Sequence, residues 1–181
     1  MVSKSEMTLR DMSAEFLGTM VLMLFGLGVN AQVTLGKVSV PLSQGDLGRS
    51  VEKITEFQYG DYLSINFGWG VAVMLAVYVA GGVTGAHINP AVTIAMACRR
   101  ALPWSRVVPF IAAQMLGAFV ASAIVYGVYY EQIQNLEAVE AAGSEVFAGV
   151  DSLEPQGNSS DSVNQHTMVT AGIFGTYPRS F

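Results

Sequence analysis

The tripeptide Asn89-Pro90-Ala91 is the most informative polar feature of the sequence, because it stands at the start of a short apolar segment. An asparagine amide can donate a hydrogen bond to a passing oxygen atom. The first N–H groups of a helix lack intrahelical partners, and the helix dipole places about half a positive elementary charge there. Proline suits this first turn. A helix starting at Pro90 would therefore offer donors to neutral polar solutes and repel cations.

The segment from residue 84 to 98 is too short to cross a bilayer, although it is apolar enough to lie inside one. A helix over 90–98 would be about 14 Å long, roughly half of a ~30 Å hydrocarbon core. We therefore predict a re-entrant half-helix, preceded by extended backbone. Such backbone is tolerated at membrane depth only where protein buries it or where it lines a wet cavity.

Three longer apolar stretches must position this segment. They run over about 12–35, 62–83 and 107–130. Each has the ~20 residues that a membrane span needs, and a chain that is 51% hydrophobic and 13% charged fits the membrane class. The polar residues between 36 and 61 predict a connection outside the hydrocarbon core. The sequence therefore predicts an all-α membrane protein, with three spans and one half-helix in residues 1–130.

Five of the nine basic residues lie on two segments that precede predicted spans. They are Lys4 and Arg10 before the first span, and Arg99, Arg100 and Arg106 before the third. Basic residues favour the cytoplasmic side of a membrane. Residues 131–161 contain acidic residues and no basic ones. We therefore predict a cytoplasmic N-terminus and an extracellular loop over 131–181.

Other features of the sequence carry little chemistry. Cys98 is the one cysteine, so it cannot form a disulfide within the chain, and it lacks neighbouring Cys or His ligands for a metal. No nucleophile and base pair or phosphate-binding loop is present, and the net charge of −5 says nothing of nucleic acid. We expect no enzyme activity, no cofactor, no metal and no nucleic-acid partner. Glu15 and Gln114 lie inside predicted spans and must therefore find polar partners.

Several stretches resemble the first half of a glycerol facilitator, an aquaglyceroporin of the major intrinsic protein, or aquaporin, superfamily. They are GVTGAHINPAVT at 82–93, AEFLGT at 14–19, PFIAAQMLGAFVASAIVYGVYY at 109–130 and AGIFGTYPRSF at 171–181. The resemblance implies the first half of an inverted repeat, in which three spans and a half-helix recur in each half.

The resemblance assigns roles to the residues around the half-helix. Asn89, with Pro90 and Ala91, matches the first pore asparagine of the family. The segment before it matches a ladder of backbone carbonyl groups that accept hydrogen bonds from permeating hydroxyls. These carbonyls belong to Gly85, Ala86, His87 and Ile88. For His87, the backbone carbonyl is expected to serve rather than the ring.

The resemblance also assigns roles to residues of the spans. Trp69 falls where the family places an aromatic residue of its selectivity constriction, and tryptophan there resembles bacterial-type glycerol facilitators. Val73, one helical turn further on, would share the pore face. An interfacial position remains the alternative for Trp69, since tryptophan is enriched at membrane interfaces. Glu15 matches the buried glutamate that holds the re-entrant loop through hydrogen bonds, and Gln114 is expected to support the same loop.

The function implied by this resemblance is a passive channel for glycerol, small polyols and water, with ions and protons excluded. The parent protein is expected to be a homotetramer in the lipid bilayer of the plasma or inner membrane. The sequence stops before a second repeat, so we expect a truncated chain that does not conduct alone. The alternatives are a water-selective aquaporin, which Trp69 disfavours, and a non-conducting membrane fragment.

Overall fold

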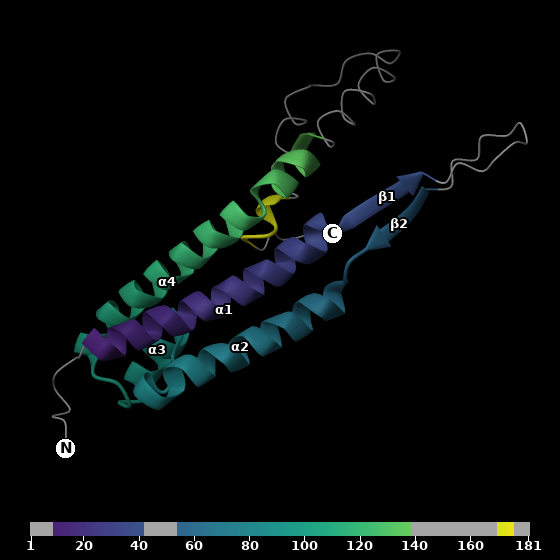
Figure 1. Cartoon of the computed structure of the whole chain (residues 1–181). Helices are drawn as coiled ribbons and strands as arrows, with labels where there is room; N and C mark the ends of the chain where they lie inside the picture. Colours follow the sequence, from purple (N-terminus) through teal and green to yellow (C-terminus); the bar gives the residue numbers. More distant parts are fainter. Residues whose placement is uncertain (1–8, 42–53, 139–169, 176–181) are drawn as a thin grey trace, which may run out of the picture. The chain divides into compact units, whose positions relative to one another are not determined.

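The computed structural model describes residues 9–41, 54–138 and 170–175 of the chain, and these form two compact units (Figure 1). The first unit contains residues 9–29 and Leu63–Val128. The second contains residues 30–41, 54–62, 129–138 and 170–175. The candidate site lies in the first unit.

Within the described part of the chain, three helices are long and apolar enough to cross a membrane. They are α1 (Leu9–Leu35), α2 (Tyr62–Thr84) and α4 (Val107–Val128), the last preceded by the short 3-10 helix η1 (Trp104–Arg106). These helices confirm the three predicted spans, with α1 beginning three residues before the predicted start at 12. The short helix α3 (Pro90–Cys98) covers the predicted half-helix over 90–98.

Small residues let the long helices of the first unit approach closely. A methyl group built on Gly117 of α4 would lie 2.4 Å from the backbone oxygen of Phe16 on α1, and one built on Gly18 would lie 2.9 Å from the Cβ of Ala80 on α2. The buried face of α2 consists of alanines. Close contact through small side chains is how membrane helices associate, because lipid is as apolar as leucine.

The connection between α1 and α2 contains a two-stranded ribbon that the sequence analysis did not predict. Strand β1 (Lys37–Pro41) pairs antiparallel with β2 (Ile54–Gln58), and Lys37 lies opposite Gln58. The Tyr59 backbone N–H donates to the Gly36 oxygen (3.0 Å) and closes the base of the ribbon. Lys37–Pro41 alternates polar and apolar residues up to a closing proline, but Ile54–Gln58 does not alternate, so the second segment lacks the pattern that predicts a strand.

The residues that follow α4 also differ from the prediction. We expected a loop throughout 131–181, but residues 130–138 are helical. Ile133 of this helical segment is buried, and Glu137 accepts a hydrogen bond from the Thr170 hydroxyl (2.7 Å). An apolar contact and a long-range hydrogen bond thus stabilise a segment whose local sequence is acidic and weakly periodic. Most of the predicted loop lies outside the described residues.

Candidate pore-lining site

Glu15 of α1 is fully buried beside the segment that joins α2 to α3. Its Oε1 accepts hydrogen bonds from the backbone N–H of His87 (3.1 Å) and from the Thr84 hydroxyl. Its Oε2 accepts from the backbone N–H of Ile88 (2.8 Å) and from the Gln114 amide (2.8 Å). All four groups donate, which suits an ionised carboxylate because it can only accept. These hydrogen bonds offset the cost of burying the carboxylate.

The segment 85–88 has a left-handed backbone at three of its four residues. The angle φ is +84° at Gly85, +54° at Ala86 and +43° at Ile88. This conformation suits glycine, but it costs about 1–3 kcal/mol for other residues and is exceptional for a β-branched side chain. The carbonyl oxygens of 85–88 accept no hydrogen bond from any described residue. The segment therefore holds four carbonyl groups without a hydrogen-bond donor among the described residues, beside the start of α3.

Asn89 caps the N-terminus of α3. Its backbone is extended (φ −156°), and its Oδ1 accepts a hydrogen bond from the Ala91 backbone N–H (2.8 Å). Pro90 occupies the first turn, where no backbone donor is lost. Because the cap uses the side-chain oxygen, the amide nitrogen of this exposed residue does not donate to any residue that the structure describes, and its two N–H groups can donate to another molecule.

Hydrogen bonds of Thr93 and Gln114 connect α3 to α4 next to this cap. Gln114 donates through Nε2 to the hydroxyl oxygen of Thr93 (2.9 Å), in addition to its hydrogen bond with Glu15. The Thr93 hydroxyl donates to the backbone oxygen of Asn89 (3.0 Å). Both side chains are almost fully buried. One connected set of hydrogen bonds therefore links α1, the segment 85–88, α3 and α4.

Trp69 and Val73 lie one helical turn apart on α2. The Trp69 ring is half-buried and packs over Gly26 of α1, where a methyl group would lie 2.5 Å from the ring. Val73 is exposed. Gly26 thus makes the space in which the tryptophan ring lies against the neighbouring span.

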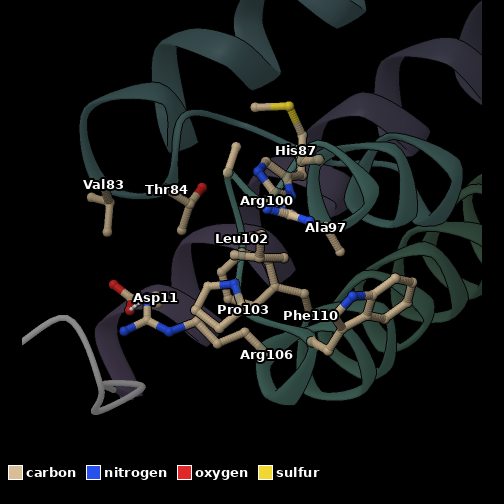
Figure 2. A pocket seen from close by; sticks show the side chains of 13 residues that line it. Asp11, Val83, Thr84, His87, Ala97, Arg100, Leu102, Pro103, Arg106 and Phe110 are labelled. Carbon is tan, nitrogen blue, oxygen red and sulfur yellow. Dashed lines mark hydrogen bonds and ion pairs between the residues drawn. The ribbon is translucent and has the colours of Figure 1, made fainter.

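A cavity of about 640 Å³ adjoins the C-terminal half of α3 (Figure 2). Its lining includes His87, Thr84, Arg100 and the ion pair between Asp11 and Arg106, in which Nη1 and Oδ2 are 3.5 Å apart. The His87 ring meets the ring of Phe110, also part of the lining, edge to face, with 5.5 Å between centroids. The cavity therefore combines one histidine ring with charged groups from α1, η1 and the end of α3.

A family model described as Major intrinsic protein matches residues 2–177 of the chain. The chain belongs to the major intrinsic protein family. The aquaglycerol porin AQY3 of Saccharomyces cerevisiae is 43% identical over 129 residues, which are 71% of this chain and 17% of that protein. Aquaglyceroporin-9 of Botryotinia fuckeliana is 39% identical over 179 residues, 99% of this chain and 31% of that protein.

A solved structure agrees with this family. The aquaglyceroporin from Plasmodium falciparum matches with a TM-score of 0.55 and 32% identity, over 70% of this chain and 44% of its own. This chain spans 17% to 44% of the length of the three relatives. The predicted resemblance to the N-terminal portion of an aquaglyceroporin is confirmed. The apolar helices of the chain, together with its family, show a multi-pass membrane protein.

The structure brings together most of the residues that the sequence analysis selected. Glu15, Gln114, the segment 85–88 and Asn89 form one hydrogen-bonded cluster in this major intrinsic protein. Trp69 instead contacts Gly26 on α1. Among residues 9–41, 54–138 and 170–175, no three His, Cys, Asp or Glu side chains are placed to hold a metal ion.

The sequence analysis missed two threonines and one ion pair. Thr93 follows Asn89 by one helical turn, a spacing at which a threonine hydroxyl can reach the earlier carbonyl group. Thr84 ends α2 and contacts Glu15. The pair of Asp11 with Arg106 joins residues far apart in sequence, so no local pattern could have indicated it.

Proposed function

We propose that this sequence forms the first repeat of a passive pore for glycerol, small polyols and water. The observation that carries the proposal is the start of α3, where Asn89 follows directly on residues 85–88, whose carbonyl oxygens accept from no described residue. A polyol carries hydroxyl groups that both donate and accept. It can therefore donate to the carbonyl oxygens while it accepts from Asn89.

The same arrangement disfavours ions and protons. The N-terminus of α3 carries partial positive charge, which repels cations. Anions would lose their hydration shell next to carbonyl oxygens, which carry partial negative charge. A neutral solute loses less on dehydration and regains its hydrogen bonds along the segment 85–88. Passage of this kind requires no covalent chemistry, so the proposal is a channel and not an enzyme.

We assign selectivity between solutes to Trp69 and Val73. An aromatic ring and an apolar side chain offer a wall to the carbon side of glycerol, while carbonyl groups take its hydroxyls. The packing of Trp69 over Gly26 supports a fixed ring position. The rival assignment is an aromatic residue of the membrane interface.

We further propose that the protein lies in the plasma or inner membrane with its N-terminus in the cytoplasm, and that the pore protein is a homotetramer. Orientation is testable in a Cys98→Ser background by adding Ser5→Cys or Ser152→Cys, two positions outside the described residues. A membrane-impermeant thiol reagent applied outside cells should label the cysteine at 152 and miss the one at 5. The opposite labelling would reverse the proposed orientation.

The pore itself is testable in a chimera. The 129 aligned residues of the Saccharomyces cerevisiae aquaglycerol porin are replaced by the matching residues of this chain, and this protein is called the chimeric channel below. Stopped-flow light scattering of liposomes should show glycerol permeability well above that of empty vesicles, without a proton leak. Asn89→Asp keeps the capping oxygen but removes the amide donors, so it should lower glycerol flux. A folded chimeric channel that passes no glycerol contradicts the proposal.

A further inference from the structure

The two ring nitrogens of His87 have different surroundings. Nδ1 lies 3.3 Å from the Thr93 hydroxyl oxygen. Nε2 has no hydrogen-bond partner among the described residues, and the ring lines the 640 Å³ cavity. In a neutral imidazole one nitrogen donates and the other accepts. The position of one proton therefore decides whether a molecule in the cavity meets a donor or an acceptor at Nε2.

The orientation of Gln114 is the first step in locating that proton. Its Nε2 lies 2.8 Å from a carboxylate oxygen of Glu15 and 2.9 Å from the Thr93 hydroxyl oxygen. A carboxylate only accepts, so the amide nitrogen, and not the amide oxygen, must face Glu15. Both amide hydrogens are then in use, one toward Glu15 and one toward Thr93.

The Thr93 hydroxyl is the second step. A hydroxyl has one proton and two lone pairs. Its proton goes to the backbone oxygen of Asn89 (3.0 Å), and one lone pair accepts from Gln114. The second lone pair of the Thr93 oxygen remains for His87, and it can only accept a hydrogen bond. The hydrogen bond between them therefore requires the proton to be on His87 Nδ1.

We propose that the relay from Glu15 through Gln114 and Thr93 holds neutral His87 in the Nδ1–H tautomer, so that Nε2 carries the lone pair of a ring that lines the cavity. The inference rests on the proposed pore function and adds to it. Of residues 85–89 only His87 lines this cavity, so the proposal extends the solute path from the carbonyl oxygens of 85–88 into the cavity. There the imidazole ring offers one acceptor to a hydroxyl or water that can donate. His87 thus acts as a specificity residue, and Gln114 and Thr93 act as positioning residues.

Nitrogen NMR of the histidine ring tests the tautomer directly, without any need for conduction. The full 181-residue chain is labelled with ring-¹⁵N histidine in lipid, and His166→Asn removes the second histidine, which lies outside the described residues. In the spectrum of the neutral ring, Nδ1 should carry the proton and Nε2 should be bare. A proton on Nε2, as predominates in free histidine, overturns the proposal.

Substitution of Thr93 tests the relay. Thr93→Val keeps the shape but removes the hydroxyl, so the spectrum should move to the Nε2–H form. Thr93→Ser restores the hydroxyl and should restore the Nδ1–H form. If Thr93→Val does not fold, the smaller Thr93→Ala removes the same hydroxyl. Retention of the Nδ1–H form without a hydroxyl at 93 means that the relay is not the cause.

The solute contact is tested in the chimeric channel. His87→Phe keeps a ring against Phe110 and removes the Nε2 acceptor, so glycerol permeability should fall about five-fold, the effect of one net hydrogen bond. Unchanged permeability with a confirmed Nδ1–H tautomer contradicts the role in solute contact. If the chimeric channel with His87 in place conducts no glycerol, the proposed function is refuted. The NMR measurement of the tautomer does not depend on that result.

Discussion

Replacing Glu15 by glutamine is the most decisive change that the structure suggests. The substitution conserves size and shape but exchanges one acceptor oxygen for an amide nitrogen, which donates. The native carboxylate accepts at both oxygens, from the His87 N–H and Thr84 on one side and from the Ile88 N–H and Gln114 on the other. A glutamine can satisfy only one of these two sides. On the other side its NH₂ group faces two donors.

The expected magnitude follows from the hydrogen bonds that are lost. Hydrogen bonds to a charged group contribute roughly 1.5–3 kcal/mol each, so the loss of two costs about 3–6 kcal/mol. Removal of a buried charge returns part of this, because the carboxylate no longer has to be desolvated. We therefore expect Glu15→Gln to lower the free energy of unfolding by about 2–4 kcal/mol.

The measurement is unfolding in mixed micelles by titration with sodium dodecyl sulfate, followed by the fluorescence of Trp69 and Trp104. Glu131→Gln makes the same chemical change at an exposed position and is the matched control. It should shift the free energy of unfolding by no more than about 0.5 kcal/mol. Equal stability of the Glu15 and Glu131 variants would show that the carboxylate does not hold the segment 85–88, and the reasoning would fail.

Three further predictions concern close contacts of glycine and of tryptophan. Gly117→Ala should destabilise the protein in the same unfolding assay, because its methyl group meets backbone of α1 at 2.4 Å, whereas Gly127→Ala, with nothing within 4 Å, should be neutral. Gly26→Ala should displace the Trp69 ring and change the ratio of glycerol to larger-polyol flux in the chimeric channel, and Gly28→Ala, which has open space, should leave that ratio unchanged. Trp69→Ala should reduce the same discrimination with folding retained; an unchanged ratio would place Trp69 in the interface belt instead.

The long elements of this fold could be predicted from sequence because length and hydropathy decide them. The half-helix over 90–98 was predictable as well, since Pro90 marks its start and the segment is too short to cross. The ribbon formed by β1 and β2 was not, because Ile54–Gln58 lacks the alternation of polar and apolar residues that indicates a strand. The helix over 130–138 was missed because its stabilising contact comes from Thr170, far along the chain.

The candidate site was predictable in its residues but not in its backbone. A lone acid in an apolar span, Glu15, must find partners, and this much follows from the cost of burying charge. No sequence rule indicates left-handed φ at Ala86 and Ile88, because isoleucine disfavours that conformation. Tertiary hydrogen bonds from residues 87 and 88 to α1 compensate for the local strain.

The buried carboxylate of Glu15 and the carbonyl groups of residues 85–88 are linked through the backbone N–H groups of the same segment. In regular structure a backbone N–H and a backbone C=O satisfy one another, so a row of free carbonyl oxygens normally leaves an equal number of buried donors without partners. Here each of the four N–H groups has an acceptor. The Gly81 oxygen accepts from Gly85 (3.1 Å), the Thr84 hydroxyl accepts from Ala86 (3.2 Å), and Glu15 accepts from His87 and Ile88. In the proposed pore, the carbonyl oxygens of the same segment are then left for a solute. Two of these four residues, His87 and Ile88, therefore depend for their backbone donors on an acidic side chain of α1 about seventy positions earlier.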